Sequence, residues 1–217
     1  MRSQRFADLL TRGWVRLAGH LDTAECAALA KPQTLPWTEM APKVGAVTQH
    51  GWFARLPFHG APSPVQAFGS VMRATVSAAL GQHLPEWTDA TWQRYEPGYG
   101  HIDPHRDQAY YKGVILIVTL SGEAAFTVLE SRDPPVTLDR WTTSGGDVVL
   151  LRGADLGALG ARCPLHQVGT PTSGRLTMTL RHNERGYISW PTPSARTAGA
   201  TGTSTRTANI ACRGTSV

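Results

Sequence analysis

The second half of the chain consists of short runs of β-type residues with no helical pattern between them. From Thr91 onward these runs are bounded by Gly, Pro, Asp and Ser, and they are TWQRY, GVILIVTL, AAFTVLE, PVTLDRW, GDVVLLRG, CPLHQVG and RLTMTLR. Without crossover helices, the strands are expected to pair mainly antiparallel. Helices followed by such strands predict an α+β, mainly β fold. We expect a double-stranded β-helix (jelly roll) or related sandwich, with N-terminal helices packed on one outer face.

Two helices are predicted before the strands. Asp22 and Glu25 form a capping arrangement ahead of an Ala-rich segment. Ser63 is expected to be the N-cap of a longer helix, with Pro64 in its first turn and Gly81 ending it. An apolar stripe along this helix is expected to pack against a sheet; it consists of Val65, Phe68, Met72, Val76 and Ala79.

The net charge is concentrated at the C-terminal end. The chain has 217 residues, with 21 Lys+Arg against 16 Asp+Glu and a pI of about 9.4. Residues 191–217 contain three arginines and no acidic residue, so residues 1–190 carry 18 basic against 16 acidic groups, or +2. That end is rich in Thr, Ala, Ser and Gly and is expected to be a disordered tail. Residues 1–190 are expected to form one domain, with 1–90 as helical support and substrate lid and 91–190 as the jelly-roll core.

The compartment is inferred from two further features. No stretch approaches the roughly 20 apolar residues needed to span a bilayer, and the N-terminal segment, with Asp8 and no long apolar core, is a poor signal peptide. Cys26, Cys163 and Cys212 are odd in number and widely spaced, which argues against a disulfide framework. A reducing, cytoplasmic location is therefore expected.

The segment YEPGYGHIDPHRD contains four possible metal ligands at alternate positions: His101, Asp103, His105 and Asp107. Alternate residues of an extended chain project to one side. A His-x-Asp pair supplies one neutral nitrogen and one anionic oxygen, and on Fe(II) it leaves a third protein ligand to be found. His166, in a separate β-type run, is the candidate. Two histidines and one carboxylate on one face of Fe(II) are typical of non-haem oxygenases.

The last β-type run places two arginines on one face. In RLTMTLR, Arg175 and Arg181 share a face with two threonines, and if that face lines a cavity the arginines need a buried anion. Six strand steps span roughly 20 Å, and each side chain reaches about 6 Å back along the strand. The remaining gap, on the order of 8 Å, fits a five-carbon dicarboxylate held by planar guanidinium forks. The alternative is an edge strand with two solvent-facing arginines.

The order of these motifs resembles that of Fe(II)/2-oxoglutarate-dependent dioxygenases, most closely the AlkB-like branch. The resemblance covers roughly residues 91–183 and rests on RYEPG, HRD, GDVVLLRG, the downstream histidine and RLTMTLR. It implies that His105, Asp107 and His166 are the catalytic iron ligands. It also implies co-substrate roles for four residues: Arg175 at the distal carboxylate of 2-oxoglutarate, Arg181 near its keto-acid end, and Tyr95 and Gln93 as assisting polar groups.

The resemblance also implies an activity. Fe(II), 2-oxoglutarate and O2 would together hydroxylate a substrate C–H bond, with release of succinate and CO2. When the hydroxylated carbon bears a heteroatom, the outcome is demethylation. The pair His101 and Asp103 remains an alternative to His105 and Asp107, but the second pair lies closer to the GVILIVTL run, as in the family. Cys163 is interpreted as a small buried residue, because a soft sulfur ligand would not suit this Fe(II) chemistry.

The substrate is expected to be a small molecule, with methylated nucleic acid as the alternative. Residues 1–190 carry only +2 and have no cluster of Lys and Arg to neutralise phosphates. Aromatic groups that could stack on a flipped base are nevertheless present: Trp37, Trp52, Phe53, Tyr99, Tyr110 and Tyr111. Residues 31–60, which include Arg55, are expected to form the lid. A second alternative, a cupin-like binding module, is disfavoured because no glutamate follows His105 before Glu123.

Overall fold

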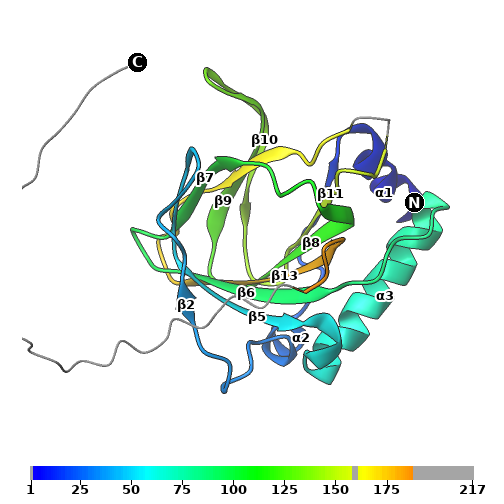
Figure 1. Ribbon diagram of the computed structural model, residues 1–217, viewed down its shortest axis with the longest axis horizontal. Helices are drawn as coiled ribbons and strands as arrows, with labels where there is room; N and C mark the ends of the chain where they lie inside the picture. Colours follow the sequence, from blue (N-terminus) through cyan, green and yellow to red (C-terminus); the bar gives the residue numbers. More distant parts are fainter. Residues whose placement is uncertain (1, 158–160, 188–217) are drawn as a thin grey trace, which may run out of the picture. The chain divides into compact units, whose positions relative to one another are not determined.

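The protein is built on two antiparallel β-sheets that face each other (Figure 1). The computed structural model describes residues 2–157 and 161–187. The seven-stranded major sheet has the order β1 (Trp14–Leu17), β11 (Val148–Arg152), β8 (Tyr111–Ser121), β13 (Arg175–Asn183), β6 (Asp89–Tyr95), β5 (Trp52–Pro57), β2 (Thr38–Glu39). The six-stranded minor sheet has the order β10 (Pro135–Thr143), β9 (Ala124–Arg132), β12 (Leu165–Val168), β7 (His101–His105), β4 (Val47–His50), β3 (Lys43–Val44).

The seven predicted β-type runs all form strands, and the predicted jelly-roll fold is confirmed. The chain repeatedly crosses between sheets: β6, β8, β11 and β13 belong to the major sheet, whereas β7, β9 and β12 belong to the minor sheet. This alternation makes neighbours of strands that are distant in sequence. It places β12 beside β7, and β13 between β6 and β8.

Helices cover the outer face of the major sheet, as predicted (Figure 1). They are α1 (Arg2–Thr11), α2 (Thr23–Ala28) and α3 (Ser63–Leu80), with a 3-10 turn η1 (Phe58–Gly60) before α3. Val65, Met72 and Val76 of α3 are buried in one core cluster with Leu180 of β13. Full burial of such a side chain contributes about 1.5 to 3 kcal/mol, so the stripe anchors the helix to the sheet.

The helix ends agree with the sequence except at one position. Asp22 and Glu25 form a capping box: each side chain accepts a hydrogen bond from the other's backbone N–H at 2.8 Å. Gly81 ends α3 in the left-handed conformation, with φ of 63°. The prediction that Ser63 is the N-cap is wrong. Pro62 occupies that position in an extended conformation, and Ser63 is already helical without a capping side chain.

The N-terminal third contains more sheet than its expected role of helical support and lid implies. Residues 31–60 hold β2 to β5. In the major sheet β5 pairs with β6 and β2 forms the edge, and in the minor sheet β4 pairs with β7 and β3 forms the edge. The physical reason is that β6 and β7 would otherwise expose a row of unpaired backbone groups. The segment therefore widens both sheets around the cavity between them.

Three remaining expectations concern the chain outside the sheets. The proposed tail, residues 191–217, and Cys212 lie outside the described residues. In the described part of the chain, no helix has the length and apolar character to cross a membrane. Cys26 and Cys163 are free thiols, and both are buried.

Candidate metal and co-substrate site

The strand pairing brings two histidines side by side on the inner face of the minor sheet. His105 of β7 and His166 of β12 are direct cross-strand partners, and their ring centroids lie 4.3 Å apart. In each ring Nδ1 lies close to a backbone carbonyl: Asp103 O at 2.9 Å for His105 and Pro164 O at 3.0 Å for His166. The proton is thereby held on Nδ1, which leaves the Nε2 lone pair of each ring free to bind a metal.

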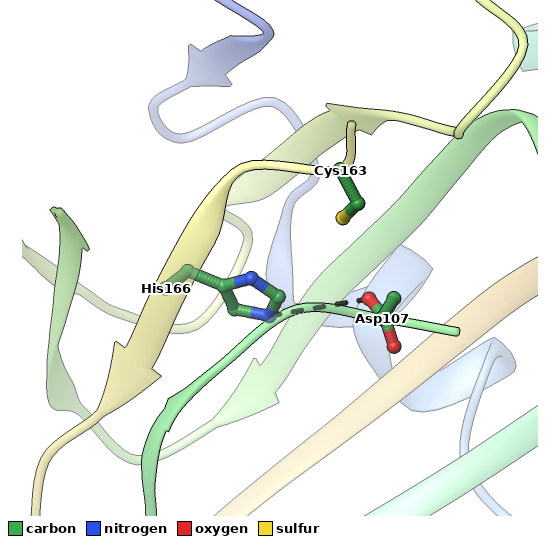
Figure 2. A group of neighbouring side chains, drawn as sticks. All are labelled: Asp107, Cys163 and His166. Carbon is green, nitrogen blue, oxygen red and sulfur yellow. Dashed lines mark ion pairs between the residues drawn. The ribbon is translucent and has the colours of Figure 1, made fainter. Parts of the chain in front are cut away.

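Asp107 lies beside this histidine pair, just after the end of β7. Its Oδ2 is 4.0 Å from His166 Nε2, and Figure 2 shows the two side chains pointing towards each other. Asp107, His166 and Cys163 can each place one ligand atom within 4.8 Å of the others. Burial, followed by the Asp107 carboxylate, raises the pKa of the Cys163 thiol, which keeps the sulfur protonated and a poor ligand.

The protonation states at the site are those that a metal requires. Burial lowers the pKa of His166 to about 4, with a further contribution from His105, so the imidazole is neutral. Burial alone would raise the pKa of the Asp107 carboxyl, but Arg181 and the two histidines together hold it below its usual value. A neutral imidazole and an ionised carboxylate are the binding-competent forms, so metal need not displace a proton from either.

The expectation that all four alternate ligands project to one side is wrong. His166 pairs with His105 and Val168 with Ile102, so β7 has one extra residue in this interval and the pairing is irregular there. The bulge reverses the pleat, so that Ile102 and His105 both line the cavity. His101 instead contacts His50 at 5.0 Å between ring centroids, outside the residues that line the cavity.

Arg175 occupies the other end of the cavity. It is only 2% exposed, and β13 lies between β8 and β6, so the alternative of a solvent-facing arginine on an edge strand is wrong. Its Nη2 donates hydrogen bonds to Thr119 Oγ1 and Thr143 Oγ1, both at 3.1 Å. Burial lowers its pKa to about 10, so the guanidinium stays charged at neutral pH.

Arg181 is oriented towards the metal end of the cavity. Its Nη2 lies 3.7 Å from Asp107 Oδ1, and its guanidinium lies over the ring of Tyr111 at 4.9 Å from the centroid. Burial disfavours the charged form, but Asp107 and Tyr111 outweigh it and raise the pKa of Arg181. Arg181 therefore holds the Asp107 carboxylate in place and ionised.

The seven residues assigned to iron and co-substrate by the family resemblance line this one cavity; they are Gln93, Tyr95, His105, Asp107, His166, Arg175 and Arg181. Tyr95 is buried against Arg175, at 5.5 Å from the guanidinium to the ring centroid, and burial raises its pKa to about 12. Gln93 Oε1 accepts a weak hydrogen bond from Thr179 at 3.4 Å. Apolar side chains, Ile117 and Phe126 among them, complete the lining.

Sequence reasoning missed three residues that support these groups. Thr119 and Thr143 hold Arg175, and no sequence signal reveals them because they come from β8 and β10. Asp89 is 1% exposed and is the cross-strand partner of Arg181. It lies four and six residues before Gln93 and Tyr95, so the alternation along β6 could have identified it as a residue of the inner face.

The cavity fits Fe(II) and 2-oxoglutarate. Two imidazoles and one carboxylate at one end match the donors that non-haem iron takes. At the other end, Arg175 Nε and Thr177 Oγ1 are buried and find no hydrogen-bond partner within residues 2–157 and 161–187. Buried donors of this kind are normally satisfied, and a ligand carboxylate would satisfy them.

Comparison by sequence finds no matching family model and no matching curated protein. Comparison by structure finds oxygenases that share the fold. An oxidoreductase of the 2OG-Fe(II) oxygenase family from Burkholderia pseudomallei has a TM-score of 0.59 and 15% identity, covering 86% of this chain and 92% of its own. A Pseudomonas putida prolyl-4-hydroxylase has a TM-score of 0.58 and 17% identity, covering 86% of this chain and 100% of its own.

The AlkB-like proteins are one group among several that share the architecture. OsALKBH1 has a TM-score of 0.54 and 17% identity, covering 79% of this chain and 97% of its own. Identities this low show a common fold and leave the substrate open. The structural neighbours are Fe(II)/2-oxoglutarate oxygenases, and the chain has the jelly-roll fold of that superfamily.

Proposed function

We propose that the protein is an Fe(II)- and 2-oxoglutarate-dependent oxygenase that hydroxylates, or oxidatively demethylates, a small molecule. One observation carries the proposal: a single cavity has His105, Asp107 and His166 at one end and the partly unpartnered guanidinium of Arg175 at the other. The fold shared with known oxygenases supports the same reaction type.

The metal would be held by His105, His166 and Asp107. The two histidines offer Nε2, because the carbonyls beside Nδ1 determine the tautomer. When bound, Fe(II) and 2-oxoglutarate supply the oxidising chemistry, in which O2 is consumed and succinate and CO2 are released. Arg181 keeps Asp107 anionic and aimed at the histidines, so its role is to position a ligand.

The co-substrate would lie along β13 with its distal carboxylate at Arg175. Thr119 and Thr143 hold one guanidinium nitrogen and leave Nε to donate to the ligand. Tyr95 and Thr177 line the same end, and each offers a hydroxyl to a carboxylate oxygen. The apolar side chains of Ile117 and Phe126 exclude water from the chain of the co-substrate.

A small-molecule substrate is favoured over nucleic acid on charge. All 18 basic and 16 acidic residues of the first 190 lie in the described part, which therefore carries only +2. Of the two arginines that line the cavity, Arg175 is buried, and Arg181 is paired with Asp107. Phosphate backbones need several exposed Lys or Arg side chains together.

The reaction type is tested without knowing the substrate. Under anaerobic conditions, Fe(II) and 2-oxoglutarate added together should give a weak visible charge-transfer band, and aerobic protein should slowly form succinate. Arg175→Ala should abolish the band at 2-oxoglutarate concentrations that saturate the wild type, whereas Arg185→Ala, at an exposed position, should not. Correctly metallated protein with neither band nor succinate would sink the proposal.

A further inference from the structure

A second charged group lies on the inner face of the major sheet, beyond the co-substrate site. Arg55 of β5 is opposite Thr91 of β6 in the strand register. Its Nε donates a hydrogen bond to Thr91 Oγ1 at 3.2 Å and lies 4.0 Å from Asp89 Oδ2. Thr91 and Asp89 belong to the same alternation along β6 as Gln93 and Tyr95, both of which line the cavity. Arg55 therefore faces the cavity side of the sheet.

The terminal fork of Arg55 is free to bind a ligand. Among the described residues, none accepts a hydrogen bond from its two terminal nitrogens, and its side chain remains 17% exposed. Nε is used for Thr91, which fixes the plane of the guanidinium. A partly buried guanidinium with an open fork is suited to bind a planar anion through two parallel hydrogen bonds.

The position of Arg55 separates it from the co-substrate carboxylate. Arg175 is opposite Tyr95 on β6, whereas Arg55 is opposite Thr91. Four strand steps separate these two points, or roughly 13 Å. Asp89, next to Arg55, is the cross-strand partner of Arg181, which in turn pairs with Asp107. Arg55 is not among the residues that line the cavity, so it lies beyond the metal end, on the side from which a substrate would approach.

The charges around Arg55 favour a single negative charge on the ligand. Arg181 is paired with Asp107, and Asp89, whose pKa is raised by burial, interacts with both Arg181 and Arg55. Both oxygens of Asp89 are buried and lack hydrogen-bond partners within the described chain. The approach of Asp89 to Arg55 is 4.0 Å, to Nε, so Asp89 leaves the terminal fork of Arg55 unoccupied. The open fork of Arg55, next to Asp89, therefore suits a ligand carboxylate with one negative charge better than a phosphate with two.

We propose that Arg55 binds a carboxylate group of the substrate, with Thr91 and Asp89 as its positioning residues. The substrates would be small carboxylic acids, amino acids included, held with a C–H bond facing the metal end of the cavity. This inference rests on the proposed function, which it deepens by naming the chemical group that selects the substrate.

The test compares acids with their neutral amides. Metallated wild-type protein is given 3-phenylpropionate, L-leucine or L-proline, each beside its carboxamide, with phenyl phosphate as a separate arm. Succinate formed above background and the shift in Tm are both recorded. At least one acid should raise succinate formation tenfold more than its amide, or raise Tm when its amide does not.

Two variants and a control assign the effect to Arg55. Arg55→Gln should raise the KM for that acid at least tenfold and remove the Tm shift that the acid causes. Arg55→Lys should recover only part of the wild-type affinity for the acid, because an ammonium lacks the planar fork. Arg140→Gln, the same change at an exposed arginine of β10, should behave as wild type. The Kd of 2-oxoglutarate, measured from the anaerobic charge-transfer band, should stay within twofold of the wild-type value in all three variants.

Four outcomes would overturn the inference. Two concern the acids: the wild type shows no difference between acid and amide, or Arg55→Gln shows the same difference as the wild type. The other two are a larger effect of phenyl phosphate than of any acid on succinate formation and Tm, and a tenfold weaker binding of 2-oxoglutarate in Arg55→Gln. The last outcome would assign Arg55 to the co-substrate instead. The charge-transfer band is recorded before any test acid is added. If the band is absent, the proposed reaction type is wrong. If the band is normal but no acid is preferred over its amide, only the role of Arg55 is wrong.

Discussion

His105 and His166 are direct cross-strand partners, with ring centroids 4.3 Å apart, although they come from distant parts of the chain. The jelly-roll crossing that places β12 beside β7 creates this contact. Asp107 completes the group, at 4.0 Å from His166. The order of the strands in the minor sheet therefore brings the metal-site residues together. Substitution of these residues can be compared with substitution of their near neighbours in sequence.

Loss of a proposed ligand should abolish metal binding. His105→Ala and Asp107→Ala should each weaken Mn(II) or Fe(II) binding by at least about 100-fold, because a lost ligand costs more than the 10- to 100-fold typical of a lost supporting group. Isothermal titration calorimetry with Mn(II) measures the affinity. His101→Ala and Asp103→Ala are the matched controls, since neither residue lines the cavity. Equal losses in the control pair would contradict the assignment.

The threonines that hold Arg175 should tune co-substrate affinity. Thr143→Val keeps the side-chain shape but removes a hydroxyl that accepts from Arg175 Nη2 and donates to Ala124 O, both at 3.1 Å. One such hydrogen bond is worth about 1 kcal/mol, so the Kd of 2-oxoglutarate should rise about fivefold. Anaerobic titration of the charge-transfer band measures it. Thr142→Val, on the exposed side of the same strand, should leave the Kd unchanged.

The metal-free protein should lose stability in mild acid because of His166. Burial lowers the pKa of His166 to about 4, whereas a histidine in an unfolded chain titrates near 6.5. Between these values the unfolded chain binds the extra proton, so the stability present above about pH 6.5 is lost as the pH falls through the window. Because each pKa unit corresponds to about 1.4 kcal/mol, the free energy of unfolding should fall by up to roughly 3 kcal/mol across this window.

Thermal unfolding of metal-free protein from pH 7 to pH 4 measures that effect. Wild-type Tm should fall across the window, and His166→Gln should show a shallower fall, because the glutamine amide does not titrate. Excess Mn(II) should oppose the fall in the wild type, since it binds the neutral imidazole. An identical slope in His166→Gln would show that other groups control the acid sensitivity.

The contact between α3 and the major sheet should dominate stability. Leu180 is 0% exposed and belongs to the core cluster that also contains Val65, Met72 and Val76. Leu180→Ala should lower the free energy of unfolding by about 2 to 5 kcal/mol. Urea unfolding of the two variants gives the comparison: Leu138→Ala, where the side chain is 51% exposed, should change stability by less than about 0.5 kcal/mol.

Local patterns in the sequence were enough to predict the elements and the residue types of the site. The Asp22 and Glu25 capping box, Gly81 at the end of α3 and the seven β-type runs all depend on residues close together in the chain. The alternation in RLTMTLR was likewise enough to place Arg175 and Arg181 on one face. Short-range hydrogen bonding and side-chain periodicity act over a few residues, so a single sequence reveals them.

Tertiary structure decided which chemically plausible residues meet. His101 and His105 are equivalent by spacing, yet the bulge between β7 and β12 turns His105 into the cavity and leaves His101 outside the lining. The support of Arg175 by Thr119 and Thr143, and the placing of Arg55 beside Asp89, depend on the register between strands far apart in the chain. Register is determined by the packing of whole sheets, which no local run of residues encodes.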